Sequence, residues 1–563
     1  MTKRLISLCI GIIMAAAMLS GCSSSNERGA AAQETPTVEP QQSPNTSSAS
    51  PENTWVDPNA PTWQQNAGDK VKFQWYINFA WFARSWGKDL TSKYITDKTG
   101  VDIEYIAPAG NEAEKLNTMI ASDTLPDLIT LGWYEIQTRQ IVDAGLVYSL
   151  DELANQYDPY FYTVADEKKL SWYKMDDGHT YGYPNASYSP LDYEKYPDKM
   201  YSNQTFLVKK DMYEAIGSPD MTTPDGFLSA LEKAKEMFPT VNNQPLIPLG
   251  IQELNDTIND KDHSLVGYLQ NFLAIPFEKD GKFYDRYTDP EYLSWLKTMR
   301  LANEKGLLSS DIFIDKRSQM EEKTAQGRYF AMIYQAQDMI AQNTSLYTED
   351  PNSVYIAVDG PMNSNGSKPT LNGGGISGWT LTMISKNCKN PDRAIQFLSY
   401  LISEEGQHDI KLGPPELWSN QGGSDLIKPE YLELENSDKD KWENEFGGDN
   451  THWMLMDNPM QIQWSVPTAE PLKQAQDWTT PYVKYNSVYD DLDPNPDTPE
   501  SVNLTKIRTK WISTLVKMLM AKNDSEFDAL FKEFLEYRDN NGFDAIQNIR
   551  NEKMTINKQK LGM

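Results

Sequence analysis

Two short runs of the chain, residues 78–84 and 132–135, combine aromatic and polar side chains directly after segments that are expected to be strands. Tryptophan and tyrosine rings offer flat apolar faces with a polar edge, and sugar rings stack on such faces. Neighbouring amide, carboxylate and guanidinium groups can form hydrogen bonds with hydroxyl groups. The chemistry available to these runs is therefore noncovalent binding, although the same rings could equally pack in an ordinary core.

Patterns that support catalysis are weak in this chain. It contains no Gly-x-Ser-x-Gly, no His-Glu-x-x-His and no phosphate-binding loop. The four histidines, His179, His263, His408 and His452, show no metal-ligand spacing. Glycoside hydrolysis needs two carboxylates that flank the scissile bond, and a chain with 80 acidic residues always offers such pairs. We therefore expect no enzyme, with a secreted glycoside hydrolase as the main competing hypothesis.

One acidic run, residues 491–497, alternates oxygen-bearing side chains as a calcium-binding EF-hand loop does. Its sixth position is Pro496, where such a loop needs glycine, and its twelfth is Val502 instead of glutamate. We interpret the run as a solvated acidic loop ahead of a helix, and we predict neither a metal ion nor a cofactor.

The first aromatic run lies within a predicted strand–helix–strand unit, between its first strand and its helix. Residues 71–77 alternate apolar and polar side chains, residues 85–99 have helical spacing up to Gly100, and residues 101–105 alternate again. Such a unit is typical of a parallel sheet covered by helices. Ligands of open α/β sheets bind beyond the carboxyl ends of the strands, which is where the first aromatic run is expected to lie.

The second aromatic run follows a short apolar strand over residues 128–131, with helices predicted over 111–122 and 137–143. Further along, Thr223 and Asn390 each precede Pro-Asp, a pattern that favours a helix start. One helical stripe covers residues 504–519 and another helix opens at Ser525. The predicted fold class is therefore α/β with a helical C-terminal region.

The N-terminus predicts export. Lys3 and Arg4 precede an apolar run over residues 5–19, which is too short to cross the roughly 30 Å hydrocarbon core of a membrane comfortably. The following Leu-Ser-Gly-Cys, ending at Cys22, resembles a bacterial lipobox. That resemblance implies cleavage before Cys22 and attachment of a diacyl lipid to its thiol. A plain signal peptide is the alternative.

Cysteine usage agrees with this reading, because Cys9 lies in the signal, Cys22 carries the lipid, and Cys388 remains alone. The mature chain can then form no internal disulfide, and we expect Cys388 to be a packed thiol. Residues 22–68 after the signal are rich in small, polar and proline residues, so we expect a lipid anchor and flexible linker there.

The whole chain of 563 residues carries a net charge of −28, 15 tryptophans and 30 tyrosines. This charge argues against nucleic acid as a partner, since phosphates would be repelled. It also disfavours a strongly anionic ligand, although a local arginine could override that effect. The length predicts at least two lobes, and we expect a monomer.

Several segments, in order, resemble family-1 extracellular solute-binding proteins of carbohydrate ABC transporters, including maltose-binding proteins and the longer LplA-like Gram-positive lipoproteins. The segments that carry this resemblance are Leu-Pro-Asp-Leu-Ile at 125–129, and residues 144–151, 180–184, 207–235, 327–332, 384–401 and 524–528. The resemblance implies a two-lobed periplasmic-binding-protein-like fold of type II, with a hinge and a ligand cleft between the lobes.

On this basis we expect a signal peptide over residues 1–21, the anchor and linker over 22–68, and the first lobe over 69–182. The second lobe is expected over 183–368, a return to the first lobe over 369–430, and a mainly helical region that packs on the second lobe and hinge over 431–563.

The resemblance also suggests which residues hold ligand. Sugar contacts of maltose-binding proteins lie in loops that correspond to the two aromatic runs, and Gln335 follows the segment 327–332, where relatives often carry a stacking tryptophan. Trp379 and Trp453 are candidates by their place in the chain and their aromatic character only. The full set of predicted ligand-binding residues is Asn78, Trp81, Arg84, Trp133, Tyr134, Glu135, Gln335, Trp379 and Trp453.

The implied function is the substrate-binding component of an ABC importer, lipid-anchored at Cys22 on the extracellular face of a Gram-positive cytoplasmic membrane. It would capture an oligosaccharide and deliver it to permease subunits. A lipoprotein that displays a binding surface without import and a peptide-binding relative are the alternatives. The sequence leaves open whether the sugar is neutral or a uronate, and whether Arg84 faces a uronate or a surface acid.

Overall fold

The computed structural model describes residues 59–252, 263–447, 455–496 and 498–563. These residues all belong to one compact unit that begins at Trp55. Cys22, the signal, most of the linker and Trp453 lie outside the described residues. Within the described ranges, no helix combines the length and the apolar composition that crossing a membrane requires.

The first sheet has the strand order β2-β1-β3-β14-β4. Strand β1 is parallel to β2 and β3, whereas β14 is antiparallel to both β3 and β4. The strands are β1 (Val71–Ile77), β2 (Val101–Ile106), β3 (Leu128–Gly132), β4 (Tyr183–Pro184) and β14 (Thr380–Ile384).

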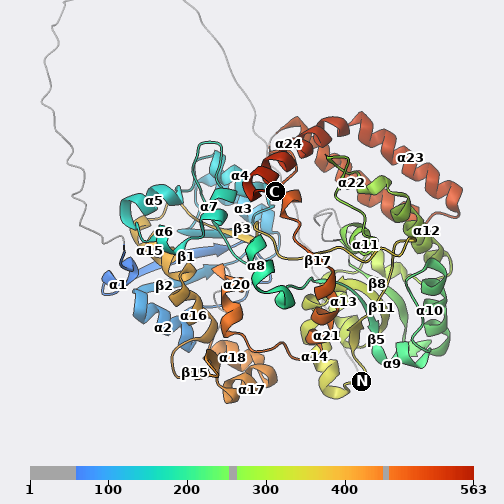
Figure 1. Cartoon of the computed structure of the whole chain (residues 1–563), viewed down its shortest axis with the longest axis horizontal. Coiled ribbons are helices and arrows are strands. Elements are labelled where there is room, and N and C mark those ends of the chain that lie inside the picture. Colours follow the sequence, from blue (N-terminus) through green and yellow to red (C-terminus); the bar gives the residue numbers. More distant parts are fainter. Residues whose placement is uncertain (1–58, 253–262, 448–454, 497) are drawn as a thin grey trace, which may run out of the picture. The chain divides into compact units, whose positions relative to one another are not determined.

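Helices bury both faces of the first sheet (Figure 1). Successive residues of a strand point to opposite faces, and accordingly Trp75 packs with residues of α2, α5 and α15, whereas Tyr76 packs with residues of α3 and α4. The helices of this part are α1 (Thr62–Gln65), α2 (Leu90–Thr99), α3 (Glu112–Ser122), α4 (Ile136–Asp143), α5 (Leu150–Tyr157), α6 (Phe161–Val164), α7 (Glu167–Trp172), α15 (Pro391–Ile402) and α16 (Glu404–Leu412).

The second sheet has the order β12-β5-β11-β8, with strands β5 (Gln204–Lys209), β8 (Ile247–Ile251), β11 (Tyr329–Gln335) and β12 (Tyr355–Ala357). One core joins it to α10 (Pro224–Met237), α11 (Leu269–Phe272), α12 (Pro290–Glu304), α22 (Pro499–Leu519) and α23 (Asp524–Asn540). Another core joins it to α13 (Arg317–Ala325), α14 (Ile340–Glu349) and α21 (Leu472–Thr479).

The chain passes from the first sheet to the second between β4 and β5, and it returns between β12 and β14. The remaining helices are α8 (Pro190–Lys195), α9 (Lys210–Ala215), α17 (Pro429–Ser437), α18 (Lys439–Glu445), α20 (Asn458–Gln461) and α24 (Phe543–Leu561). The remaining strands form the pairs β6 (Thr240–Val241) with β7 (Gln244–Pro245), β9 (Glu278–Lys279) with β10 (Lys282–Phe283), β15 (Trp418–Gln421) with β16 (Ser424–Ile427), and β13 (Leu371–Asn372) with β17 (Val483–Lys484).

These elements confirm the predicted α/β class, and the predicted helix start at Thr223 is also confirmed, since its side chain accepts a hydrogen bond from Gly226 N. The helix predicted over residues 85–99 is wrong at its start, because α2 begins only at Leu90. Asp89 caps that helix by accepting from Ser92 N, and Gly87 ahead of it has a φ of 80°, which is incompatible with a helix.

The described part of the acidic run, residues 491–496, is also not the simply solvated loop predicted from the sequence. Asp493 Oδ2 accepts a hydrogen bond from Arg508 at 2.6 Å, and its Oδ1 accepts one from Arg550 at 2.8 Å. Burial alone would raise the pKa of Asp493, but the two arginines hold it well below its usual range. Asp493 therefore ties this segment to α22 and α24.

Cys388 lies between β14 and α15 and is buried, as expected for a packed thiol. Burial raises the pKa of Cys388 to about 12. The thiol is therefore protonated at neutral pH and is a poor nucleophile.

Candidate functional site

Three segments distant in sequence meet at one edge of the first sheet. Strands β1 and β3 are parallel neighbours that end at Ile77 and Gly132, and the antiparallel β14 begins at the same edge, with Thr380 opposite Gly132. The residues that continue from this edge, Asn78, Trp133 and Trp379, therefore come together. The backbone N–H of Trp133 donates to the Trp379 carbonyl at 3.4 Å.

An aromatic group, which we define as Phe79, Trp81, Trp133, Tyr134 and Trp379, lies at this edge. Phe79 stacks on Trp379 with ring centroids 4.8 Å apart, and Trp81 stacks on Phe79 at 5.4 Å and on Trp379 at 6.2 Å. Trp81 remains 54% exposed and Tyr134 48% exposed. The partly buried Trp133 is held by a hydrogen bond from its indole N–H to the Gly378 carbonyl at 3.1 Å. The group thus presents oriented ring surface to solvent.

A buried hydrogen-bond chain supports these rings. Asn78 is only 2% exposed; its amide Nδ2 donates to Glu135 Oε2 at 2.5 Å, and its Oδ1 accepts from the Tyr76 hydroxyl at 2.8 Å. The other carboxyl oxygen of Glu135 accepts from Gly132 N at 2.6 Å. Asn78 therefore acts on the site by fixing Glu135 rather than by reaching solvent itself.

Glu135 has a strongly altered acidity. Burial raises the pKa of Glu135 to about 7, against the opposing effect of the hydrogen bonds from Gly132 and Asn78, and the negative charge of Glu112 raises it further. Glu112 lies in the first turn of α3 and accepts a hydrogen bond from Ala80 N at 2.8 Å. The edge therefore combines exposed rings with two carboxyl groups, one of which changes its charge near neutral pH.

Arg84 follows the first aromatic run but is engaged by another part of the chain. Its guanidinium forms a two-bond ion pair with Glu443 of α18, with Arg84 Nη2 donating to Glu443 Oε1 at 2.7 Å. The Glu443 side chain is only 9% exposed. In this structure Arg84 thus faces an acidic side chain of its own chain, and its predicted contact with ligand stays a prediction.

The structure brings six of the nine sequence-predicted residues to this edge, engages two others elsewhere and does not describe the ninth. Gln335 ends β11 in the second sheet, where it pairs with Gln204 across the strands. Arg84 belongs to the loop after β1 but is paired with Glu443, and Trp453 lies outside the described residues. The six residues that meet are Asn78, Trp81, Trp133, Tyr134, Glu135 and Trp379.

Sequence reasoning missed Phe79 and Glu112. Phe79 is 8% exposed and stacks on both Trp81 and Trp379, so it supports both rings. Its place inside the first aromatic run was a sufficient signal. Glu112 reaches the site from a different helix, and no pattern in the sequence distinguished it from the other acidic residues.

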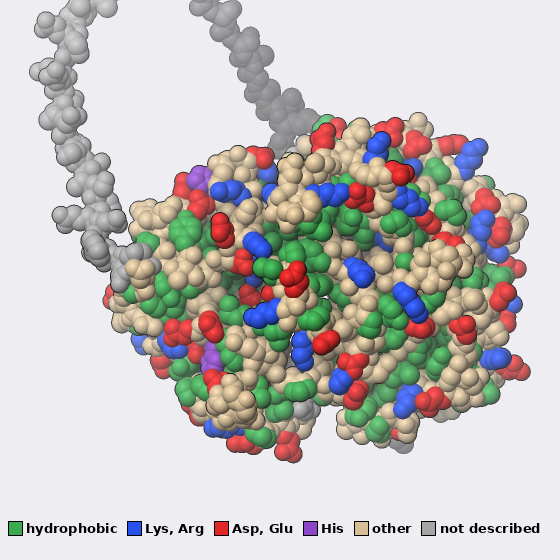
Figure 2. Space-filling view, in the orientation of Figure 1, with side chains coloured by type: hydrophobic (Ala, Val, Ile, Leu, Met, Phe, Trp, Pro, Cys, Tyr) green, Lys and Arg blue, Asp and Glu red, His purple; other side chains and the backbone are tan. Residues whose placement is uncertain are grey.

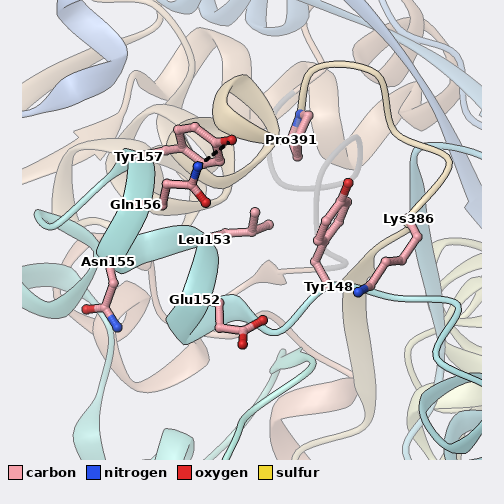
Figure 3. A pocket seen from close by; sticks show the side chains of 8 residues that line it. All are labelled: Tyr148, Glu152, Leu153, Asn155, Gln156, Tyr157, Lys386 and Pro391. Atoms are coloured by element: carbon pink, nitrogen blue, oxygen red, sulfur yellow. Dashed lines mark hydrogen bonds between the residues drawn. The ribbon is translucent and has the colours of Figure 1, made fainter. Parts of the chain in front are cut away.

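A separate pocket of about 570 Å³ opens at the opposite edge of the first sheet (Figure 3). Figure 3 shows the side chains of α5 on one side and those of Lys386 and Pro391, which follow β14, on the other. Lys386 Nζ lies 5.1 Å from the centroid of the Tyr148 ring. The pocket shares no residue with the aromatic group; its lining is Tyr148, Glu152, Leu153, Asn155, Gln156, Tyr157, Lys386 and Pro391.

A protein-family model matches the chain. The profile described as bacterial extracellular solute-binding protein covers residues 90–411, more than half of the chain. A curated relative, the fructooligosaccharide ABC transporter substrate-binding protein FusA of Streptococcus pneumoniae serotype 4, is 25% identical over 236 residues. This alignment spans 40% of the chain and 43% of the relative, so it covers less than half of the relative's length.

Solved structures resemble the chain over most of its length. An HMO-binding, ABC-transporter-associated solute-binding protein from Bifidobacterium longum infantis superposes with a TM-score of 0.63 at 16% identity, over 87% of this chain and 99% of that one. An alginate-binding protein without calcium ion gives 0.61 at 17% identity, over 87% and 99%. FusA of Streptococcus pneumoniae in complex with kestose gives 0.58 at 17% identity, over 86% and 99%. At these identities the likeness establishes a shared fold, and the predicted two-lobed fold is confirmed.

Proposed function

The chain belongs to the bacterial extracellular solute-binding proteins, and from this we propose that it is the substrate-binding component of an ABC importer that captures an oligosaccharide at the aromatic group. The observation that carries the proposal is the half-exposed Trp81 ring, stacked on Phe79 and Trp379. An exposed ring that is held in one orientation loses little conformational freedom when a sugar stacks on it. The relative FusA, whose name refers to fructooligosaccharides, supports this ligand class.

Each residue of the edge has a role in this proposal. Trp81 offers its face to the apolar side of a sugar ring, and the exposed Tyr134 offers ring surface and a hydroxyl group. Glu135 accepts hydrogen bonds from sugar hydroxyls, in an orientation that Asn78 fixes. Trp379 and Trp133 complete the surface from β14 and the loop after β3.

The second sheet supplies the opposite side of the site in this proposal. Gln335 ends β11, and its amide is suited to hydrogen-bond sugar hydroxyls. Ligand that contacts both sheets would favour a closed arrangement of the two lobes through a hinge motion. Arg84, in the loop after β1, stays in the proposed set of ligand-binding residues, and so does Trp453, which lies outside the described residues.

The cellular role in this proposal depends on the N-terminal segment. Cleavage before Cys22 and lipid attachment to its thiol would hold the protein on the extracellular face of the cytoplasmic membrane. The linker over residues 22–68 would let the folded part reach the permease subunits, to which it delivers the sugar as a monomer. The protein binds its ligand without chemical conversion.

The test is a thermal-shift screen of the chain from Ser23 onward against neutral, uronate-containing and peptide ligands. Binding to the native state alone stabilises it, by about 4 kcal/mol when the ligand concentration is roughly 1,000 times the dissociation constant. A shift with a class of oligosaccharide, with the sugar recovered unchanged by chromatography, supports the proposal. A shift only with peptides, or hydrolysis of the sugar, would overturn it.

A further inference from the structure

Resting on the proposed function, the charges around the aromatic group carry an inference about the ligand itself. We infer that this site takes uncharged oligosaccharides and discriminates against uronate-containing ones, because Glu112 and Glu135 flank the exposed rings and three described cations on the surrounding elements, Arg84, Lys115 and Arg139, already have partners. This inference concerns the charge of the sugar, which neither the fold nor the family determines.

The first part of the argument is the position of the two carboxyl groups. Glu135 follows Trp133 and Tyr134 directly and is joined to Asn78 at the end of β1. Glu112 binds the backbone N–H of Ala80, the residue next to Trp81. The loops that carry the exposed rings are therefore both held by acidic side chains. A ligand carboxylate stacked on these rings would lie close to two groups of like charge.

The second part is the state of the cations on the surrounding elements. Arg84, in the loop after β1, is paired with Glu443. Lys115, on α3, donates to the Ala107 carbonyl at 3.1 Å and lies 5.5 Å from the centroid of the Tyr76 ring. Arg139, on α4, forms an ion pair with Asp143 at 2.9 Å, one turn further along its own helix. Each of these cations has a partner within the chain.

Cations of the second lobe near Gln335 are also held by other side chains of the protein. Arg317 of α13 forms an ion pair with Glu321 at 2.8 Å and one with Asp338, in the segment after β11, at 3.3 Å. Arg286 is only 6% exposed and donates to Asn271 at 2.6 Å, so its charge is enclosed in the protein. Figure 2 shows acidic and basic side chains interspersed over the drawn face, without a broad basic patch.

The third part concerns pH. Because burial raises the pKa of Glu135 to about 7, its charge is largely absent below that pH and present above it. A ligand carboxylate would then be repelled more strongly as the pH rises above 7, whereas a neutral sugar would show a smaller change. The discrimination should therefore grow in alkaline solution.

The experiment uses titration calorimetry on the chain from Ser23 onward at about pH 8. It compares the affinity for a neutral oligosaccharide with the affinity for the same sugar after its primary hydroxyl groups have been oxidised to carboxylates. The carboxylated sugar should bind at least about tenfold more weakly. Added salt should reduce the ratio of the two dissociation constants, since it screens repulsion between charges that water can reach. Oligogalacturonate and alginate oligomers serve as independent acidic probes, and neither should give a measurable binding heat under these conditions.

Three variants assign the discrimination to its residues. Glu112→Gln should reduce the ratio by removing one carboxylate, and Glu443→Gln should reduce it by releasing Arg84 toward the ligand. Glu236→Gln, which removes the same charge from an exposed position on α10, should leave the ratio unchanged. The melting temperature of each variant shows whether it is folded, and the salt dependence of the unmodified protein tests the repulsion without any substitution.

Two results would overturn different claims. Acidic sugars that bind as tightly as neutral ones, or more tightly, would refute the inference and leave the proposed function in place. An absence of binding to every saccharide, neutral and acidic, would refute the proposed function and with it this inference. A ratio that is unchanged by both salt and Glu112→Gln would show that the discrimination does not arise from these carboxyl groups.

Discussion

The amide of Asn78 donates a hydrogen bond of 2.5 Å to the carboxylate of Glu135, across the ends of the two adjacent parallel strands β1 and β3. This bond joins the two loops that carry Trp81 and Tyr134. Because Asn78 also accepts a hydrogen bond from the Tyr76 hydroxyl, its orientation is fixed from the sheet side. The direction of the Glu135 side chain is thus a property of the sheet rather than of an independent loop.

The raised pKa of Glu135 predicts that the contribution of this residue to stability decreases as the pH increases toward neutrality. Native Glu135 binds its proton more tightly than an unfolded glutamate does, so its contribution is complete below about pH 4.5 and is lost as the pH rises through about 7. A shift of this size corresponds to at most about 3 kcal/mol of unfolding free energy. Glu135→Gln should flatten the dependence of the unfolding free energy on pH between about 4.5 and 7. Urea unfolding at a series of pH values measures this dependence.

Glutamine can occupy this position without a large penalty, because Asn78 can turn its amide over and donate to the Tyr76 hydroxyl instead. Glu236→Gln on α10 is the matched control for a lost charge, and its pH dependence should match that of the unmodified protein. If Glu135→Gln shows the same pH dependence as the unmodified protein, Glu135 has an ordinary pKa.

The exposed ring of Trp81 should contribute to binding and little to folding. Trp81→Ala removes a face that is 54% exposed, so the melting temperature should change little, whereas the sugar dissociation constant should rise at least about tenfold, as for an interface hot spot. Titration calorimetry and a thermal melt measure the two effects separately. Tyr162→Ala, at a ring 45% exposed on α6, is the control and should change neither. Equal affinity of Trp81→Ala and the unmodified protein would remove Trp81 from the site.

Phe79 should affect both properties, because it is 8% exposed and its ring supports Trp81 and Trp379. Phe79→Ala removes a buried ring and should cost about 3 kcal/mol of unfolding free energy. It should also weaken sugar binding, since the two tryptophan rings lose the ring on which they stack. Denaturant unfolding measures the loss of stability, and titration calorimetry measures the change in sugar affinity. Weakened binding at full stability would place Phe79 in direct contact with ligand instead.

Much of the fold could be predicted from the sequence because the signals are local. Alternation identified β1, and the Thr-Pro-Asp pattern identified the start of α10 at the capping residue Thr223. The start of α2 was placed too early, because helical spacing of Trp86 with later residues does not show that Gly87 interrupts the helix. Periodicity detects which residues are apolar, and it does not detect a backbone break between them.

The site was only partly predictable, because its geometry depends on pairings across the sheet. The aromatic runs were visible in the sequence, but the stacking of Phe79 on Trp379 requires β14 to lie beside β3, a pairing that spacing along the chain does not contain. The Arg84–Glu443 pair likewise joins segments that are far apart in sequence. Such long-range ion pairs have no local signature, so the sequence could name Arg84 as a candidate but could not identify its partner.

The link between Asp493 and two arginines predicts a measurable contribution to stability in the helical C-terminal region. Asp493→Asn removes both ion pairs and leaves Arg508 and Arg550 without this carboxylate. Because the Asp493 side chain is 39% exposed and water screens the pairs, we expect the free energy of unfolding at neutral pH to fall by about 1–2 kcal/mol. The lowered pKa of Asp493 means that this stabilisation is present at neutral pH and is lost only in strong acid.

The specificity of this effect can be tested against an exposed ion pair of the same region. Glu536→Gln disrupts the pair with Lys532 on the surface of α23 and should change stability by less than about 1 kcal/mol. A double-mutant cycle of Asp493→Asn with Arg550→Gln should give a coupling energy of at least about 1 kcal/mol, because the two groups share hydrogen bonds. Additive effects of the two substitutions would show that Asp493 does not hold α24 through Arg550.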